Sequence, residues 1–168
     1  FISDSIEYCK NKRIQTIIEP VNLKELFDEA IAQLMHIENA NKITFTKELL
    51  LDQIQSDRLR LRIIISNLLS NEIKYADNSK QEMLISIKTY VDGGFHKIEI
   101  SDNGIGIKEE FREHIFEMYF GTNKNKGSGL GLYIVKEAVE NIKGNISVSS
   151  KTNIGSKFIV TIPNTYDD

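Results

Sequence analysis

Hydrophobic residues recur every three or four positions in several stretches of the chain, and this spacing predicts amphipathic helices. The first helix is expected from Leu23 to about Glu38. Asp57 is a typical N-cap residue, and a second helix is expected from it to about Tyr75. A short helix is expected near Lys108 to Met118, and a longer one from Ser128 to Ile142.

Alternating polar and apolar residues predict five strands. They cover about residues 43–46, 83–91, 95–101, 145–150 and 157–162. Asp92-Gly93-Gly94 is typical of a tight hairpin turn between two of them, and Asn153-Ile154-Gly155 turns between the last two. Helices and antiparallel strands in this order predict an α/β fold, a two-layer α/β sandwich in which a mixed, mostly antiparallel sheet packs against three main helices.

Composition is that of a soluble globular domain, with 168 residues, 40% hydrophobic and 27% charged. The net charge of −3 disfavours binding to nucleic acid. Cys9 is the only cysteine, so an intrachain disulfide and a zinc cluster are excluded and a reducing, cytoplasmic location is expected. The start at Phe1 suggests a fragment, which makes no membrane contact itself although the full protein could be membrane-anchored. Residues 1–13 read as the tail of a preceding element, and residues 14–165 as one domain.

The second predicted helix carries a polar face whose chemistry suits a metal and a phosphate. Asn67, Asn71, Lys74 and Tyr75 are spaced so that they share one side of this helix. An Asn side-chain oxygen is a hard neutral ligand that suits Mg²⁺, and Lys74 adds a positive charge beside it. A helix with a solvated polar face explains this segment equally well when it is taken alone.

Two glycine-containing segments follow. The segment from Asp102 to Ile107 lies where a predicted strand ends. Its glycines allow the backbone to approach a ligand closely. The Asp102 carboxylate can accept a hydrogen bond from an exocyclic amine. Taken alone, this segment is more typical of a turn. Gly127 to Leu132 opens a helix, where free amides and the helix dipole favour an anion, but it fits neither a P-loop nor a Rossmann fingerprint. The loop before it carries Lys124 and Lys126, whose charges suit phosphates.

In combination these segments resemble the histidine-kinase branch of the family that unites gyrase, the ATP-dependent heat-shock chaperone, histidine kinases and mismatch-repair ATPases. Asn67 to Tyr75 resembles the N box and Asp102 to Ile107 the first glycine box. Phe116 with Tyr119 and Phe120 resembles the F box, and Gly127 to Leu132 the second glycine box. The resemblance covers about residues 15–163 and implies a Bergerat-type ATP-binding fold.

The resemblance also implies ATP and Mg²⁺ as ligands. Asn71 would hold Mg²⁺ and, with Lys74, form the catalytic pair at the phosphates. Asp102 would accept the adenine amine, and Met118 to Lys126 would form the ATP lid. The implied ATP-binding residues are Asn67, Asn71, Lys74, Tyr75, Asp102, Gly104, Gly106, Ile107, Phe120, Lys124, Lys126, Gly127, Ser128, Gly129, Leu130, Gly131, Leu132 and Ser156.

The residue four positions before the magnesium Asn favours a kinase over an ATPase. Hydrolysing relatives usually carry Glu there as a general base, whereas Asn67 cannot take up a proton at neutral pH. The sequence is therefore interpreted as the catalytic fragment of a two-component sensor histidine kinase, which transfers the γ-phosphoryl group of Mg-ATP. A nucleotide-gated ATPase, or a degenerate ATP-binding interaction module of the same superfamily, remains the alternative.

The expected phosphoacceptor is not in this sequence. His36, His96 and His114 do not lie in the His-Glu/Asp-x-x-x-Pro context of family acceptors. The resemblance therefore implies two protein partners, a histidine-containing dimerisation domain of the same kinase and a response regulator receiver domain. Residues 1–13 would be the tail of the helical hairpin in that dimerisation domain.

Two residues depart from the family pattern. Gly121 stands where a basic residue often follows the F-box aromatics, so Lys124 or Lys126 would supply that charge. Glu72 falls on the apolar side of the second helix, where the family usually has a small residue. A buried, unpaired carboxylate is costly, so the side chain bends outward, pairs with a cation or lies in a distorted helix.

Overall fold

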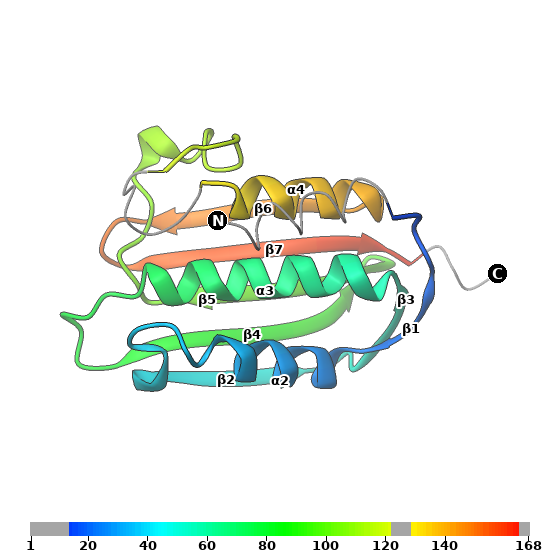
Figure 1. Cartoon of the computed structure of the whole chain (residues 1–168), viewed down its shortest axis with the longest axis horizontal. Helices are drawn as coiled ribbons and strands as arrows, with labels where there is room; N and C mark the ends of the chain where they lie inside the picture. Colours follow the sequence, from blue (N-terminus) through cyan, green and yellow to red (C-terminus); the bar gives the residue numbers. More distant parts are fainter. Residues whose placement is uncertain (1–13, 122–128, 165–168) are drawn as a thin grey trace.

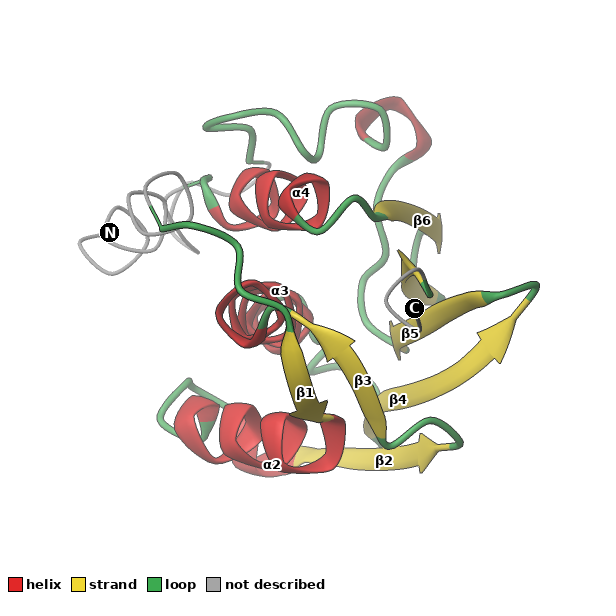
Figure 2. Cartoon of the chain, turned by 90° about the vertical axis from the view of Figure 1, so that its right-hand side faces the viewer, coloured by secondary structure: helices red, strands yellow, loops and turns green. Residues whose placement is uncertain are grey.

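The computed structural model describes residues 14–121 and 129–164, and its central feature is a five-stranded sheet covered on one face by three helices (Figures 1 and 2). The strand order is β2-β4-β5-β7-β6. The strands are β2 (Ile43–Leu49), β4 (Met83–Asp92), β5 (Phe95–Asp102), β6 (Asn145–Lys151) and β7 (Gly155–Pro163), and the helices are α2 (Leu23–Leu34), α3 (Arg58–Lys74) and α4 (Gly131–Asn141). The predicted two-layer α/β sandwich is confirmed. The predicted tail over residues 1–13 lies outside the described residues.

The sheet is mixed and mostly antiparallel, as predicted. β2 runs parallel to β4, and α3 lies between them in sequence because parallel neighbours need a long connection. The remaining neighbours pair antiparallel. Gly93 and Gly94 close the β4–β5 hairpin with φ angles of 58° and 80°, which suit a two-residue turn and which glycine adopts without steric cost.

The hydrophobic core lies between the helices and the sheet. α3 occupies the middle of the helical layer, with α2 and α4 on either side (Figure 1). Apolar side chains of α3 and of strands β4, β5 and β7 are fully buried against one another, and these include Leu61, Ile65, Leu68, Ile87, Ile100, Phe158 and Val160. Burial of this apolar face is the main force that fixes α3, and with it the polar residues on its other side.

The secondary structure departs from the predictions in three places. A second, two-stranded sheet of β1 (Glu19–Asn22) and β3 (Gln53–Ser56) was not predicted. The helix expected over residues 108–118 is a single 3₁₀ turn, η2 (Glu109–Phe111), followed by turns. Another 3₁₀ turn, η1 (Ala40–Lys42), precedes β2, and α2 ends before the expected Glu38.

The segment after η2 continues in three-residue turns that do not form a regular helix. The backbone bonds from His114 to Phe111, from Glu117 to His114 and from Phe120 to Glu117 all span three residues rather than four. The Phe120 ring lies 5.8 Å from that of Phe111 and 5.9 Å from that of His114, measured between centroids, so the segment turns back on itself.

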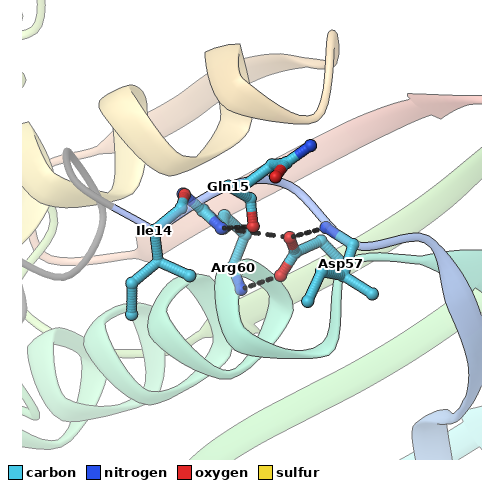
Figure 3. Close-up of polar contacts among 5 residues, drawn as sticks. Ile14, Gln15, Asp57 and Arg60 are labelled. Atoms are coloured by element: carbon cyan, nitrogen blue, oxygen red, sulfur yellow. Dashed lines mark hydrogen bonds and ion pairs between the residues drawn. The ribbon is translucent and has the colours of Figure 1, made fainter.

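A buried ion pair fixes the first described residues of the chain against the start of α3 (Figure 3). Asp57, the N-cap of α3, accepts the Arg60 N–H at 3.0 Å, and its carboxylate lies 3.1 Å from the Arg60 guanidinium. Both side chains are almost fully buried, at 3% and 2% exposure. Asp57 also accepts the Ile17 N–H at 2.9 Å, and Arg60 donates to the carbonyl groups of Ile14 and Gln15. We call these five residues the α3 clamp.

Candidate functional site

The polar side of α3 carries the predicted N-box residues. Asn67, Asn71 and Lys74 lie on this helix and are half-buried, and Tyr75 caps its C-terminal end. The Asn67 amide donates to the carbonyl of Ile63 at 2.8 Å, so it is turned toward the backbone of its own helix. Burial raises the pKa of Tyr75.

The N-terminus of α4 lies against this polar side. A Cβ atom added to Gly131, the first residue of α4, would lie only 3.5 Å from the Asn67 side-chain oxygen. Leu130 before it is buried, whereas Gly129, Gly131 and Leu132 are half-buried. The N-terminal end of α4 is therefore near Asn67 on the polar face of α3, and the helix dipole favours an anionic group at such an end.

Asp102 stands at the end of β5 and is held by two backbone amides. Its Oδ1 accepts the Gly104 N–H at 2.6 Å, and its carboxylate also accepts the Ser156 N–H. Burial raises the pKa of Asp102 to about 6, although these two hydrogen bonds favour the ionised form and oppose the shift. The carboxylate is therefore mostly ionised at pH 7 and is oriented by the backbone around it.

The loop after Asp102 packs against the C-terminal end of α3. The Ile105 N–H donates to the Tyr75 carbonyl at 3.2 Å. A Cβ atom at Gly104 would lie 2.6 Å from that carbonyl oxygen, and one at Gly106, whose φ is 72°, would lie 2.2 Å from the Lys151 carbonyl oxygen. Both distances are too short for any side chain, so the loop can approach α3 and β6 only with glycine at these positions.

Two serines complete the region near Asp102. The predicted Ser156 is buried, and its Oγ lies 2.8 Å from Ser150 Oγ. Ser150 also accepts the Ile107 N–H at 2.7 Å. This cluster joins β6, β7 and the first glycine segment. The end of α3, the end of β5 and the β6–β7 turn therefore meet, and sequence reasoning placed residues from each of them in one site.

The structure places only part of the predicted lid and second glycine segment. The Phe120 ring lies beside those of Phe111 and His114, and the Tyr119 N–H donates to the Gly129 carbonyl at 2.8 Å. This bond joins the two ends of the segment that the structure does not describe. The predicted residues Lys124, Lys126, Gly127 and Ser128 lie within that segment, outside the described residues.

The donor set on α3 fits a magnesium ion that shares its ligands with a phosphate. Among residues 14–121 and 129–164, no group of three or more His, Cys, Asp or Glu could hold a metal by itself. Asn71 offers one neutral oxygen, and Lys74 one positive charge. Mg²⁺ commonly takes one or two protein oxygens and completes its shell with waters and substrate phosphates. The residues therefore fit a metal that arrives with a phosphate ligand.

Sequence reasoning missed Lys80. Its ammonium group donates to the carbonyl groups of Asn103, Gly104 and Ile154, which belong to segments far from it in sequence. Its sequence context carries no motif that could have indicated this. Sequence reasoning did place Glu72 on the apolar side of α3, and this is confirmed, because Glu72 is buried at 2% exposure and its Oε1 has no hydrogen-bond partner within the described part of the chain.

Comparison with known proteins agrees with this arrangement. Residues 56–166 match the family described as histidine kinase-, DNA gyrase B- and HSP90-like ATPase. The chain is 30% identical to the sensor protein RprX of Bacteroides fragilis over 92% of its length, and 30% identical to the histidine-protein kinase BarA of Escherichia coli K12 over 94%. It spans only 34% and 18% of these two relatives.

Solved structures give the same assignment. The mycobacterial sensor histidine kinase MprB superimposes with a TM-score of 0.73 and 26% identity, over 88% of this chain and 97% of that one. The catalytic domain of histidine kinase ThkA superimposes with a TM-score of 0.75 and 26% identity, over 88% and 96%. None of the helices within residues 14–121 and 129–164 is both long and apolar enough to cross a membrane. The chain therefore belongs to the family of histidine kinase-, DNA gyrase B- and HSP90-like ATPases, and it is an ATP-binding catalytic domain of the kind found in sensor histidine kinases.

Proposed function

We propose that this domain binds Mg-ATP and transfers the γ-phosphoryl group to a histidine on a separate dimerisation domain. The observation that carries the proposal is that two groups of residues with different chemistry lie on neighbouring elements. One end has the half-buried Asp102 carboxylate held by two amides, and the other has Asn71 and Lys74 on the polar side of α3, which the N-terminus of α4 approaches at Asn67. A purine base with an exocyclic amine suits the first end, and a triphosphate suits the second.

At the base end, the Asp102 carboxylate accepts a hydrogen bond from the adenine amine. Gly104 and Gly106 leave room for the base and the sugar, and Ile107 and Tyr75 line the nucleotide. Ser156 supports this end through its N–H on Asp102. Because guanine carries a carbonyl where adenine has this amine, a carboxylate at this position selects against guanine.

At the phosphate end, Asn71 holds Mg²⁺, while Asn67 and Lys74 contact phosphate oxygens. The amides from Gly129 to Leu132 bind the phosphates at the start of α4. We extend this role to Gly127 and Ser128, and we assign Phe120, Lys124 and Lys126 to the lid that closes over ATP. Mg²⁺, when bound, neutralises charge on the triphosphate, and the side chains of α3 hold the phosphates in line with the acceptor.

Asn67 supports transfer to histidine rather than hydrolysis. Its side chain carries no group that takes up a proton at neutral pH, and its amide already donates to the Ile63 carbonyl. Water needs a base to become a nucleophile, whereas a neutral imidazole nitrogen attacks phosphorus directly. ATP is then cleaved between its β and γ phosphates, a nitrogen–phosphorus bond forms, ADP leaves and the imidazole proton passes to solvent.

The partners follow from this activity. The acceptor histidine lies on the dimerisation domain of the same kinase, and a response regulator receiver domain takes the phosphoryl group next. Because the substrate is ATP, we place the domain in the cytoplasm. The chain spans about a third or less of the curated relatives RprX and BarA, so these roles are proposed for the whole protein.

Labelled ATP tests the proposal directly. The chain is incubated with [γ-³²P]ATP, Mg²⁺ and a histidine-bearing helical hairpin, and a hairpin with this histidine replaced by glutamine serves as control. We expect an acid-labile phosphate on the first hairpin only, and no label on this chain. Release of inorganic phosphate without labelled hairpin would indicate an ATPase, and stable label on His36, His96 or His114 would contradict the assignment of the acceptor.

A further inference from the structure

Lys80 lies in the loop between α3 and β4, on a turn that is fixed by its own hydrogen bonds. The Asp77 carboxylate accepts the Ser79 N–H at 3.0 Å and the Ser79 hydroxyl at 2.6 Å. The Lys80 N–H donates to the Asp77 carbonyl at 3.2 Å. Asp and Ser commonly stabilise turns in this way. The turn therefore sets the direction in which the Lys80 side chain leaves the backbone.

The ammonium group of Lys80 contacts three carbonyl oxygens from two segments. It donates to Asn103, to Gly104 at 3.4 Å and to Ile154 at 3.3 Å. The first two carbonyls belong to the loop after Asp102, and the third belongs to the β6–β7 turn. A lysine ammonium group has three donors and no acceptor, so this set can use all of them.

Both segments carry an amide that binds Asp102. The Asn103 carbonyl belongs to the same peptide group as the Gly104 N–H, which donates to Asp102 Oδ1. The Ile154 carbonyl lies in the turn just before Ser156, whose N–H is the second donor to Asp102. A positive charge on a peptide carbonyl polarises the N–H of that peptide and strengthens it as a donor. Lys80 thus lies directly behind the Gly104 amide, and it holds the turn that leads to the Ser156 amide one peptide group further on.

Other hydrogen bonds also hold the loop after Asp102, but none of those described below involves a charged group. The Asn103 side chain accepts the Leu84 N–H and donates to the Glu82 carbonyl, each at 2.8 Å, which ties the loop to the start of β4. The Asn153 N–H donates to the Ile105 carbonyl at 2.8 Å, which ties it to the turn. These bonds are between neutral groups, whereas Lys80 adds a cation that all three of its carbonyls share.

We propose that Lys80 is a positioning residue for adenine recognition. Its ammonium group holds the Asn103–Gly104 peptide and the β6–β7 turn so that both amides keep the Asp102 carboxylate directed at the adenine amine. The inference rests on the proposed function, because it assumes that Asp102 binds adenine. Lys80 itself does not touch the nucleotide.

Two substitutions and a matched control test this role. Lys80→Met keeps the aliphatic stem and removes the ammonium group, and Lys80→Arg keeps the positive charge. Lys136→Met makes the same change on the exposed face of α4. Each variant of this chain is titrated calorimetrically with ATP and with inorganic tripolyphosphate in the presence of Mg²⁺. We expect Lys80→Met to weaken ATP binding about 3- to 10-fold and Lys80→Arg to restore most of it, while Lys136→Met leaves it unchanged.

Tripolyphosphate separates positioning of the base from general damage to the fold. It lacks adenine, so its affinity should be the same in Lys80→Met and in the unmodified chain. Amide exchange of Gly104 and Ser156, followed by NMR, should become faster in Lys80→Met. In the Asp102→Ala background, Lys80→Met should cause no further loss of ATP affinity, because the group that it orients is gone.

If Lys80→Met unfolds the chain, Asp77→Ala provides a second variant, because it loosens the turn and leaves the ammonium group in place. We expect it to weaken ATP binding by a smaller factor. Unchanged ATP affinity in the folded Lys80 variant, or an equal loss for ATP and tripolyphosphate, would overturn the role of Lys80 alone. Absence of ATP binding by the unmodified chain would instead overturn the proposed function, and the role of Lys80 with it.

Discussion

Asp102 is a half-buried carboxylate, and burial raises its pKa from 3.8 to about 6. Only the ionised form can accept the adenine amine with both oxygens available, so protonation should oppose ATP binding. We therefore expect ATP affinity to be full above pH 7 and to fall as the pH drops through about 6. Calorimetric titration with ATP from pH 5 to pH 8 measures this directly.

The phosphates of ATP also titrate near this range, so the control is Asp102→Asn, in which the nucleotide and the rest of the chain still titrate but residue 102 does not. The difference between the two proteins isolates the carboxylate. If the unmodified chain and Asp102→Asn show the same pH profile, Asp102 does not contact the bound base.

Glu72 gives a prediction about stability rather than binding. Its carboxylate is 2% exposed, and one of its oxygens has no hydrogen-bond partner among residues 14–121 and 129–164, so it carries a desolvation cost in the folded state. Glu72→Met keeps a similar volume without the charge, and we expect it to raise the free energy of unfolding by about 1 kcal/mol. Chemical denaturation measures this value, with Glu140→Met on the exposed face of α4 as a control for net charge. A less stable Glu72 variant would show that the carboxylate makes a favourable contact.

At the scale of elements, the α3 clamp should contribute strongly to stability. Asp57 and Arg60 are buried together, so removal of either partner leaves an uncompensated charge in the core. We expect Asp57→Ala and Arg60→Met each to lower the free energy of unfolding by about 3–5 kcal/mol. The double variant should lose much less than the sum of the two, because no charge remains unpaired. Additive losses in urea denaturation would contradict a coupled pair.

Sequence patterns predicted the elements whose signals are local. Asp57 caps α3 as expected, and Gly93-Gly94 closes the predicted hairpin, because both signals act within a few residues. The β1–β3 sheet was missed because its strands are four residues long and pair Glu19 with Ser56, far apart in sequence. The helix expected before Met118 was wrong, because the hydrogen bonds of this segment span three residues and the chain turns back to bring Phe120 near Phe111, a contact that the spacing does not reveal.

The same distinction applies to the candidate site. Asn71, Asp102 and Gly104 were predicted because they belong to short motifs with a known order. Lys80 could not be predicted, because its three carbonyl partners come from residues 103, 104 and 154 and meet it only in the folded chain. The proximity of Asn67 to Gly131 could not be predicted either, because it depends on how α3 packs against α4.

At the scale of the whole molecule, the proposed function requires two recognition chemistries at one site. The sheet fixes Asp102 at the end of β5, and the core fixes the polar side of α3, which carries Asn71. These two residues should therefore report on opposite ends of one bound nucleotide. Their substitutions must differ in which part of the ligand they affect, and this difference is the central claim about the molecule.

The most direct test is to titrate Asp102→Ala and Asn71→Ala with ATP and with GTP, each with and without Mg²⁺. Loss of a charged hydrogen bond in Asp102→Ala should cost about 1.5–3 kcal/mol, roughly 10- to 100-fold in ATP affinity, and should leave GTP binding nearly unchanged. Asn71→Ala should bind ATP normally without Mg²⁺ and should lose most of the gain in affinity that Mg²⁺ provides. Unaltered ATP affinity in Asp102→Ala would mean that the first glycine segment is only a turn, and it would contradict the assignment of this site to a nucleotide.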